Sequence, residues 1–146
     1  MKKIEAQTVL AIRDLFTMPY FAGVYFKKGN MIVEQNHHGV SYTPGYRRII
    51  SARLHGSEIF AVEPGDNRVF YDSCGFETNT TKSRLNLFMR CFSDHCCIYQ
   101  KDFQWFLSEG YAALFDHDKE WPGSTWLPLR IDDSSFYWRQ VEALTK

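Results

Sequence analysis

Residues 78–92, TNTTKSRLNLFMRCF, carry the strongest helix signal in the chain and decide its fold class. A hydroxyl or amide group of Asn79, Thr80 or Thr81 can accept hydrogen bonds from the free N–H groups of a first helical turn. Apolar side chains then recur at the i, i+3, i+4 and i+7 spacing of an amphipathic helix: Leu85, Phe88, Met89 and Phe92. The pattern predicts a helix over residues 80–93 with this stripe facing a core.

Residues 21–76, which precede this helix, alternate between strand and turn signals. Two β-rich runs flank Gly29-Asn30, a pair that supplies the positive φ angles of a tight hairpin turn. Together with the runs near residues 49–54, 58–62 and 68–71, this predicts an antiparallel meander of about three or four strands. Residues 4–16 predict a first helix, which Pro19 ends because the residue before a proline avoids helical angles.

The chain after the helix contains two further short β-rich runs, at residues 96–100 and 103–107. Residues 108–130 look irregular, and Asp133 or Ser134 can cap a short last helix that reaches Leu144. We therefore expect a single α+β domain over residues 1–146: a central antiparallel sheet, an N-terminal helix, the packed 80–93 helix and an irregular C-terminal extension at 108–146.

Composition excludes several functional classes. The 146 residues have zero formal net charge, with an excess of basic residues in 1–57 and of acidic residues in 58–146. This mild asymmetry argues against both a strongly acidic DNA mimic and a strongly basic, histone-like binder. The sequence shows no signal peptide and no apolar run of membrane-spanning length, so we expect a cytosolic protein with reduced cysteines.

The four cysteines are the first candidates for chemistry: Cys74, Cys91, Cys96 and Cys97. Cys91 and His95 would share one face of a continuous helix, and Cys96 or Cys97 could extend them toward a zinc site. No C-x-x-C pair supports this, and buried cysteines commonly act as small hydrophobic residues. The sequence also lacks phosphate-loop, dinucleotide and H-E-x-x-H motifs, so we expect no metal, no cofactor and no enzymatic activity.

One ordered set of motifs resembles a family of small phage and prophage proteins. The motifs are Leu54-His55-Gly56, then TNTTKSRLN at residues 78–86, then Gln100-Lys101 and Trp105-Phe106, and they fall within residues 49–107. The resemblance implies an origin in a bacterial virus, and it supplies no catalytic residues. Within the motif, Arg84 could bind a phosphate near the start of the helix, or could pair with Glu77 and lock the corner between strand and helix.

The C-terminal extension offers a candidate surface for a protein partner. Trp121 and Trp126 lie among the acidic residues Asp116, Asp118 and Glu120. Tryptophan anchors ringed by polar residues are typical of protein-binding hot spots, and the acidic ring would favour a basic partner surface. The alternative is that the extension buries these rings as a second core. Trp121 stands beside Pro122-Gly123, and we expect it to be the more exposed of the two.

A basic set in the first half of the chain suggests the alternative of nucleic-acid binding. Lys27, Lys28, Arg47 and Arg48 are interleaved with aromatic residues, and Arg84 could add a phosphate contact. Cations hold phosphates and rings stack on bases when a sheet binds a single strand. The sequence thus favours a phage accessory protein that binds a host protein, with inhibition of an antiviral defence system as one form of this role. The runner-up is a nucleic-acid-binding regulator.

Overall fold

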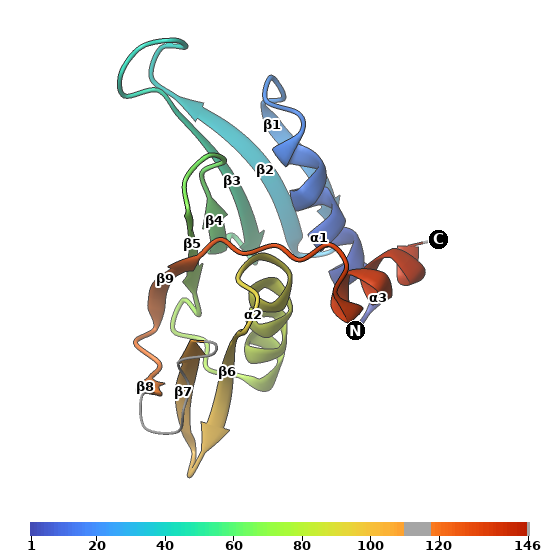
Figure 1. The fold of residues 1–146 in the computed structure, drawn as a ribbon, viewed down its shortest axis with the longest axis vertical. Helices are drawn as coiled ribbons and strands as arrows, with labels where there is room; N and C mark the ends of the chain where they lie inside the picture. Colours follow the sequence, from blue (N-terminus) through green and yellow to red (C-terminus); the bar gives the residue numbers. More distant parts are fainter. Residues whose placement is uncertain (110–117, 146) are drawn as a thin grey trace.

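The computed structural model describes residues 1–109 and 118–145 as an α+β fold with two antiparallel sheets (Figure 1). The larger sheet has the strand order β1-β2-β3-β4-β5-β9. Its strands are β1 (Gly23–Lys28), β2 (Met31–His38), β3 (Arg47–Leu54), β4 (Ser57–Val62), β5 (Arg68–Asp72) and β9 (Ser124–Pro128). The smaller sheet contains β6 (Cys96–Lys101), β7 (Gln104–Glu109) and β8 (Lys119–Glu120). The predicted meander is thus confirmed and extends to five consecutive strands.

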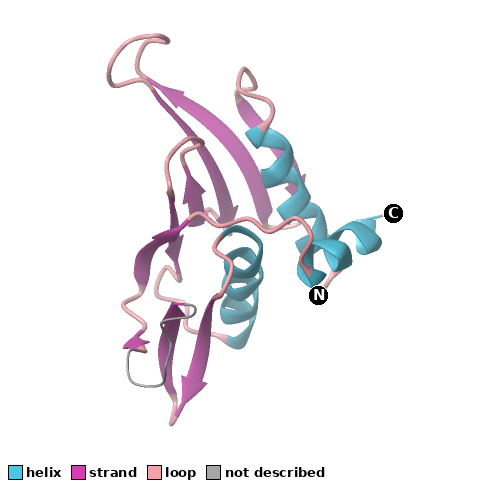
Figure 2. Ribbon diagram, viewed as in Figure 1, coloured by secondary structure: helices cyan, strands magenta, loops and turns pink. Residues whose placement is uncertain are grey.

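Three helices accompany the sheets: α1 (Lys3–Phe16), α2 (Asn79–Phe92) and α3 (Phe136–Thr145), drawn in cyan in Figure 2. Helices α1 and α2 cover one face of the larger sheet, and α3 packs against α1. Phe60 of β4 lies at the centre of the core, where its ring contacts those of Tyr71, Phe88 and Phe92. No helix in the described part of the chain is long and apolar enough to span a membrane.

Helix α2 confirms the prediction made from residues 78–92. Its whole apolar stripe is buried: Leu85, Phe88, Met89 and Phe92. The cap lies one residue earlier than expected, because the hydroxyl of Thr78 accepts the N–H of Thr81 at 3.2 Å. Asn86 bonds the backbone of Ile98 twice, donating to its carbonyl at 2.8 Å and accepting its N–H at 2.6 Å. The side chain of Asn86 therefore fastens the edge of the smaller sheet to α2.

Tight two-residue turns connect several neighbouring strands. The predicted Gly29-Asn30 turn joins β1 to β2, and His55-Gly56 joins β3 to β4 with positive φ at both positions. Asp102-Phe103 joins β6 to β7 and also has positive φ at both positions, +53° and +63°. A phenylalanine is unusual there, because a left-handed residue with a bulky side chain is sterically disfavoured.

The C-terminal segment is more regular than the sequence suggested. Residues 124–128 form β9, which pairs antiparallel with β5 and becomes an edge of the larger sheet. Alternation along β9 places Leu127 in the core and the neighbouring Trp126 on the opposite face. The expected last helix is present as α3, and its Trp138 is fully buried. Only part of the 108–146 extension is therefore irregular.

Candidate binding surfaces

Trp121 is buried, which contradicts the expectation that it projects into solvent. Only 4% of its surface is exposed, and its indole N–H donates to the hydroxyl of Ser73 at 3.1 Å. The hydroxyl of Ser73 donates in turn to the carbonyl of Gly123 at 3.1 Å. The backbone N–H of Trp121 also donates to the carbonyl of Trp105. The Pro122-Gly123 turn thus leads the chain into β9 and leaves the Trp121 ring buried. Through its bonds to Ser73 and Trp105, Trp121 connects the larger sheet to the smaller one.

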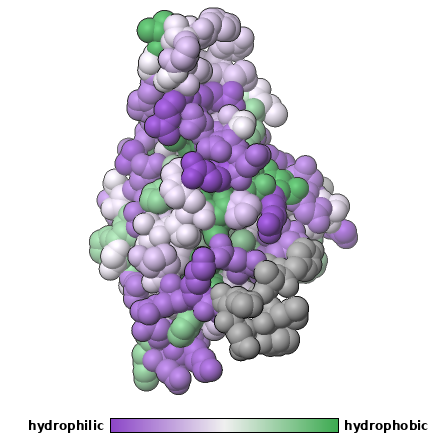
Figure 3. All heavy atoms as spheres, turned by 60° about the vertical axis from the view of Figure 1, so that its left-hand side comes forward, coloured by the Kyte–Doolittle hydropathy of each residue, from purple (hydrophilic) through white to green (hydrophobic). Residues whose placement is uncertain are grey.

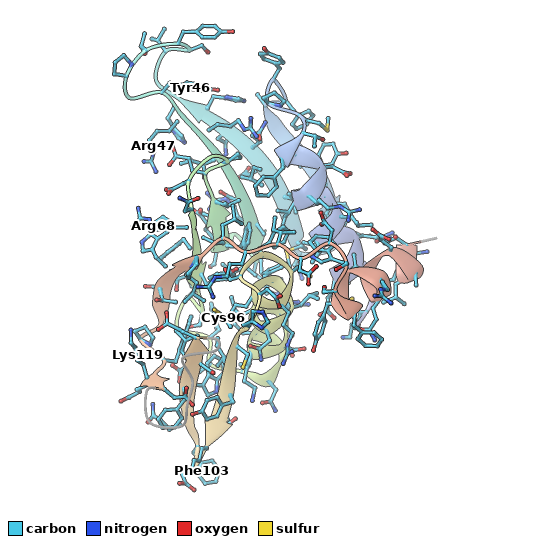
Figure 4. The ribbon with its side chains drawn as sticks, viewed as in Figure 1. Tyr46, Arg47, Arg68, Cys96, Phe103 and Lys119 are labelled. Carbon is cyan, nitrogen blue, oxygen red and sulfur yellow. The ribbon has the colours of Figure 1, made fainter. Side chains whose placement is uncertain are left out.

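Trp126, the second tryptophan of the predicted hot spot, is 47% exposed. It lies on the face of the larger sheet opposite the helices, which we call the outer face. The ring of Phe70 lies 5.2 Å away across the β5–β9 pair, and the guanidinium of Arg68 lies 4.6 Å from the indole centroid. Figure 4 shows Arg68 beside this edge of the sheet. These two contacts hold the exposed ring in one orientation.

The outer face continues from Trp126 across the sheet. Strand pairing aligns Ser51, Ala61, Phe70 and Trp126 in one row across β3, β4, β5 and β9. A shallow hollow of about 180 Å³ adjoins this row, lined by Ile49 and Ala61 among others. Figure 3, which brings the left-hand side of Figure 1 forward, shows apolar areas separated by hydrophilic ones. No described helix covers this face.

Charged side chains elsewhere on the outer face pair with one another. Arg53 bonds Glu34 at 2.6 Å and lies 3.6 Å from Glu58, and the bond to Glu34 is the main reason that the pKa of Arg53 is raised. Arg47 pairs with Glu63 at 3.3 Å. Such cross-strand ion pairs balance the charge of the face, so it presents neither a basic nor an acidic field.

The acidic residues expected around the tryptophans belong to a different part of the structure. Asp118 accepts a hydrogen bond from the hydroxyl of Tyr99, and this bond raises the pKa of Tyr99. Glu120 accepts one from the side-chain amide of Gln104 at 2.8 Å. Both contacts lie in the smaller sheet, whereas Trp126 lies in the larger one. Asp116 lies outside the described residues.

The basic residues of the nucleic-acid alternative are distributed over separate sites. Lys27 and Lys28 stand at one end of the β1–β2 hairpin, where Lys28 donates to Gln7 of α1 at 3.1 Å. Arg47 and Arg48 stand at the other end of β2, paired with His38 and His37. Arg48 points to the opposite face from Arg47 and donates to the carbonyl of Phe16 at 3.2 Å, at the end of α1.

The aromatic residues of that alternative are also divided. Tyr25 donates to Asp14 of α1 at 3.0 Å, and Phe26 is partly buried against the core. Tyr42, 95% exposed, projects from the loop between β2 and β3. Tyr46 at the base of that loop bonds His37, and both line a hollow of about 600 Å³ together with Arg48. The hollow contains one of the predicted cations rather than the whole basic set.

Cys91 and Cys96 are buried packing residues with little tendency to ionise. Burial raises the pKa of Cys91 to about 12 and that of Cys96 to about 11. The described residues contain no group of three or more His, Cys, Asp or Glu side chains placed to hold a metal ion. A thiol with so high a pKa is mostly protonated at neutral pH, when it is a poor nucleophile.

A pocket of about 330 Å³ brings together residues of two motif segments, Leu54-His55-Gly56 and residues 78–86. We call it the motif pocket. It lies between the β3–β4 turn, the segment before α2 and the first turns of α2. Its walls include Leu54, His55, Ile59, Phe76, Thr80 and Arg84. Motif residues separated by more than twenty positions in the sequence thus line one cavity.

Several polar residues of the 78–86 motif already have structural partners. Thr78 caps α2, Asn86 holds β6, and the ammonium of Lys82 lies 6.0 Å from the ring centroid of Trp105. Arg84 is half-buried and has no ion pair or hydrogen bond within the described residues, so the expected pairing with Glu77 is not formed. Arg84 thus lines the motif pocket without an ion pair to any described carboxylate.

Comparison with known proteins identifies the family. The family model described as Kyanoviridae Gp96 protein matches residues 1–127 of this chain. The chain belongs to the Kyanoviridae Gp96 protein family. The predicted resemblance to phage proteins is thus confirmed, and it extends well beyond residues 49–107 to include α1 and most of β9. No curated protein and no solved structure matches the chain.

Sequence reasoning missed two features of these surfaces. Phe70 and Arg68 lie in a run read only as a returning strand, and nothing local shows that they meet Trp126, more than fifty positions later. The motif pocket was missed because its walls come from three segments. The only sequence signal for this pocket was the ordered pattern of motifs, because residues that belong to one sequence pattern can also lie side by side in the folded protein.

Proposed function

We propose that this member of the Gp96 family is a phage accessory protein that binds a host protein through its outer face. The observation that carries the proposal is the half-exposed Trp126, held by Phe70 and Arg68 on a sheet face that no described helix covers. Tryptophan and arginine are enriched among the residues that dominate binding free energy at protein interfaces. An indole already fixed in the free protein loses little rotamer entropy when a partner covers it.

The chemistry of the outer face favours a protein partner over a nucleic acid. A strand of nucleic acid needs a continuous series of cations along its phosphates. On this face Arg53 and Arg47 already pair with carboxylates, and Lys28 and Arg48 contact α1 instead. Phe70 and Trp126 offer apolar contact area on this face bordered by balanced charges, which suits a partner surface of mixed polarity.

The phage origin directs the choice of partner. A protein of a bacterial virus meets host proteins, and components of antiviral defence are the class we propose to test first. Inhibition of such a component would follow if the outer face covers its active or assembly surface. This step rests on the family membership and on the exposed face together.

Affinity capture from a host lysate tests the proposal, with the Trp126→Ala variant as the probe. We expect this variant to lose the captured host protein, since a hot-spot tryptophan contributes about 2 kcal/mol or more, a factor of about 30 in affinity. Phe136→Ala is the matched control, because Phe136 is 67% exposed on α3 and lies outside residues 1–127. Melting temperatures of both variants should stay near that of the wild type.

Two outcomes would contradict the proposal. The first is undiminished capture of the same host protein by Trp126→Ala. The second is tight, salt-sensitive binding of a single-stranded oligonucleotide that an Arg47→Ala/Arg48→Ala double variant abolishes, which would favour the nucleic-acid alternative.

A further inference from the structure

The motif pocket has the dimensions and composition of a small-molecule site. Its volume of about 330 Å³ lies within the range of about 300–1,000 Å³ that such sites occupy. Leu54, Ile59 and the ring of Phe76 supply apolar walls, and the hydroxyls of Thr80 and Ser57 add a few polar groups. Mostly apolar walls with a few polar groups are what fix and orient a small ligand.

Phe76 and His55 stand at positions where a purely structural role is hard to find. Phe76 is 59% exposed, so its ring at the pocket wall is accessible to a ligand. His55 adopts a positive φ of +51° in the turn before Gly56, so its exposed side chain stands at the pocket wall. His55 belongs to the Leu54-His55-Gly56 motif, Phe76 lies two residues before the 78–86 motif, and both line the pocket.

Arg84 supplies the charge that selects the ligand. An arginine side chain is always protonated, and its planar guanidinium matches the geometry of carboxylate and phosphate oxygens. Here it lines a mostly apolar pocket, half-buried, with no acidic partner in the described part of the chain. A bound anion would provide the missing counter-charge, and the apolar walls would contact the remainder of the molecule.

We propose that the motif pocket binds a small organic anion, with its carboxylate or phosphate group on Arg84 and an apolar or aromatic body against Phe76, Leu54 and Ile59. The site is distinct from the outer face and does not depend on the proposed host-protein binding. Most residues that line the pocket come from the motif segments, so the motif describes a binding site as well as the turn into α2.

Two-dimensional NMR of the full chain with four probes tests this inference. Benzoate and phenyl phosphate combine a ring with an anionic group, benzyl alcohol lacks the charge, and inorganic phosphate lacks the ring. We expect one of the first two to shift amide signals in residues 54–59 and 76–84, with a dissociation constant of about 1 mM, as for a fragment-sized ligand. Benzyl alcohol and inorganic phosphate should bind at least about tenfold more weakly.

Two charge-removing variants complete the test. Arg84→Gln should weaken binding of the better probe at least about tenfold, because a charge-assisted pair is lost. Lys101→Gln, which removes an exposed charge from the β6–β7 hairpin, should leave it unchanged. Tighter binding of phenyl phosphate assigns the site to organic phosphates, and tighter binding of benzoate assigns it to carboxylates.

The inference is overturned if neither anionic probe shifts these signals up to about 10 mM, or if benzyl alcohol binds as tightly as the better anionic probe. Retained binding in Arg84→Gln has the same consequence. The comparison of the four probes uses only the wild-type protein, so it stands even where a variant folds poorly.

Discussion

Replacing Trp121 by alanine should destabilise the protein severely, although the residue stands beside a proline-glycine turn in the C-terminal half. The indole is 4% exposed and its N–H donates to Ser73 at 3.1 Å, so the variant leaves a cavity and removes the hydrogen bond that the Ser73 hydroxyl accepts. Truncating a buried tryptophan typically costs about 3–5 kcal/mol. Domains of this size are stable by about 5–15 kcal/mol, so the loss is a large share of the total.

Urea unfolding followed by circular dichroism measures the effect. With an m-value of about 2 kcal/mol/M, the midpoint of Trp121→Ala should fall by about 1.5–2.5 M. Trp126→Ala is the matched control, because its half-exposed ring contributes mainly the contact with Arg68, about 0.5–1 kcal/mol. A Trp121→Ala midpoint within about 0.5 M of the wild type would refute the burial of this ring and restore it as a surface anchor.

Four further outcomes follow from the geometry. Phe88→Ala should lower the free energy of unfolding by about 3–5 kcal/mol in a denaturant melt, and a loss below about 1 kcal/mol would place the α2 stripe in solvent. Asn86→Ala should cost about 1–3 kcal/mol, because the backbone N–H and C=O of Ile98 lose their partner; an unchanged melting temperature would contradict this. Phe103→Asn should raise stability by about 1 kcal/mol, since asparagine tolerates the left-handed turn position better, and a lower melting temperature would refute the strain. The thiol of Cys91, whose pKa is raised to about 12 by burial, should react with a thiol reagent at pH 8 only after unfolding. Its raised pKa also means that its contribution to stability is full below its ordinary pKa of 9.0 and is lost as the pH rises toward 12, a loss that Cys91→Ala should not show.

Local features of the sequence were sufficient to predict the helices and most strands of the fold, but not β8 and β9. The stripe in residues 80–93 faces the core because helical periodicity places every third or fourth side chain on one face. The Gly29-Asn30 hairpin formed as expected, with a positive φ of +60° at Gly29 alone, because the turn geometry depends on the residues in the turn itself. The ordered motifs indicated a phage family, and the family match bore this out.

Predictions for the candidate site were less successful, because exposure depends on chain segments that are far apart in the sequence. Trp121 and Trp126 are five positions apart in similar local sequence, yet one is buried and the other is half-exposed. Trp121 is held inside by Ser73, 48 residues earlier, whose hydroxyl accepts a hydrogen bond from the indole N–H. Trp126 points outward because its strand, β9, pairs with β5. Similarly, the basic residues counted as one set lie at opposite ends of β2, where several have other partners.

The sequence by itself determined the helices, the turns, most strands, the phage family and the absence of familiar catalytic motifs, since each follows from residues close together in the chain. Only the tertiary structure decided which tryptophan is available to a partner, that β9 completes the larger sheet, and that Leu54, Phe76 and Arg84 share a pocket. The burial of a side chain, and the meeting of several side chains in one pocket, depend on contacts between segments that are distant in the sequence. A local pattern of residue types does not specify which segments will meet.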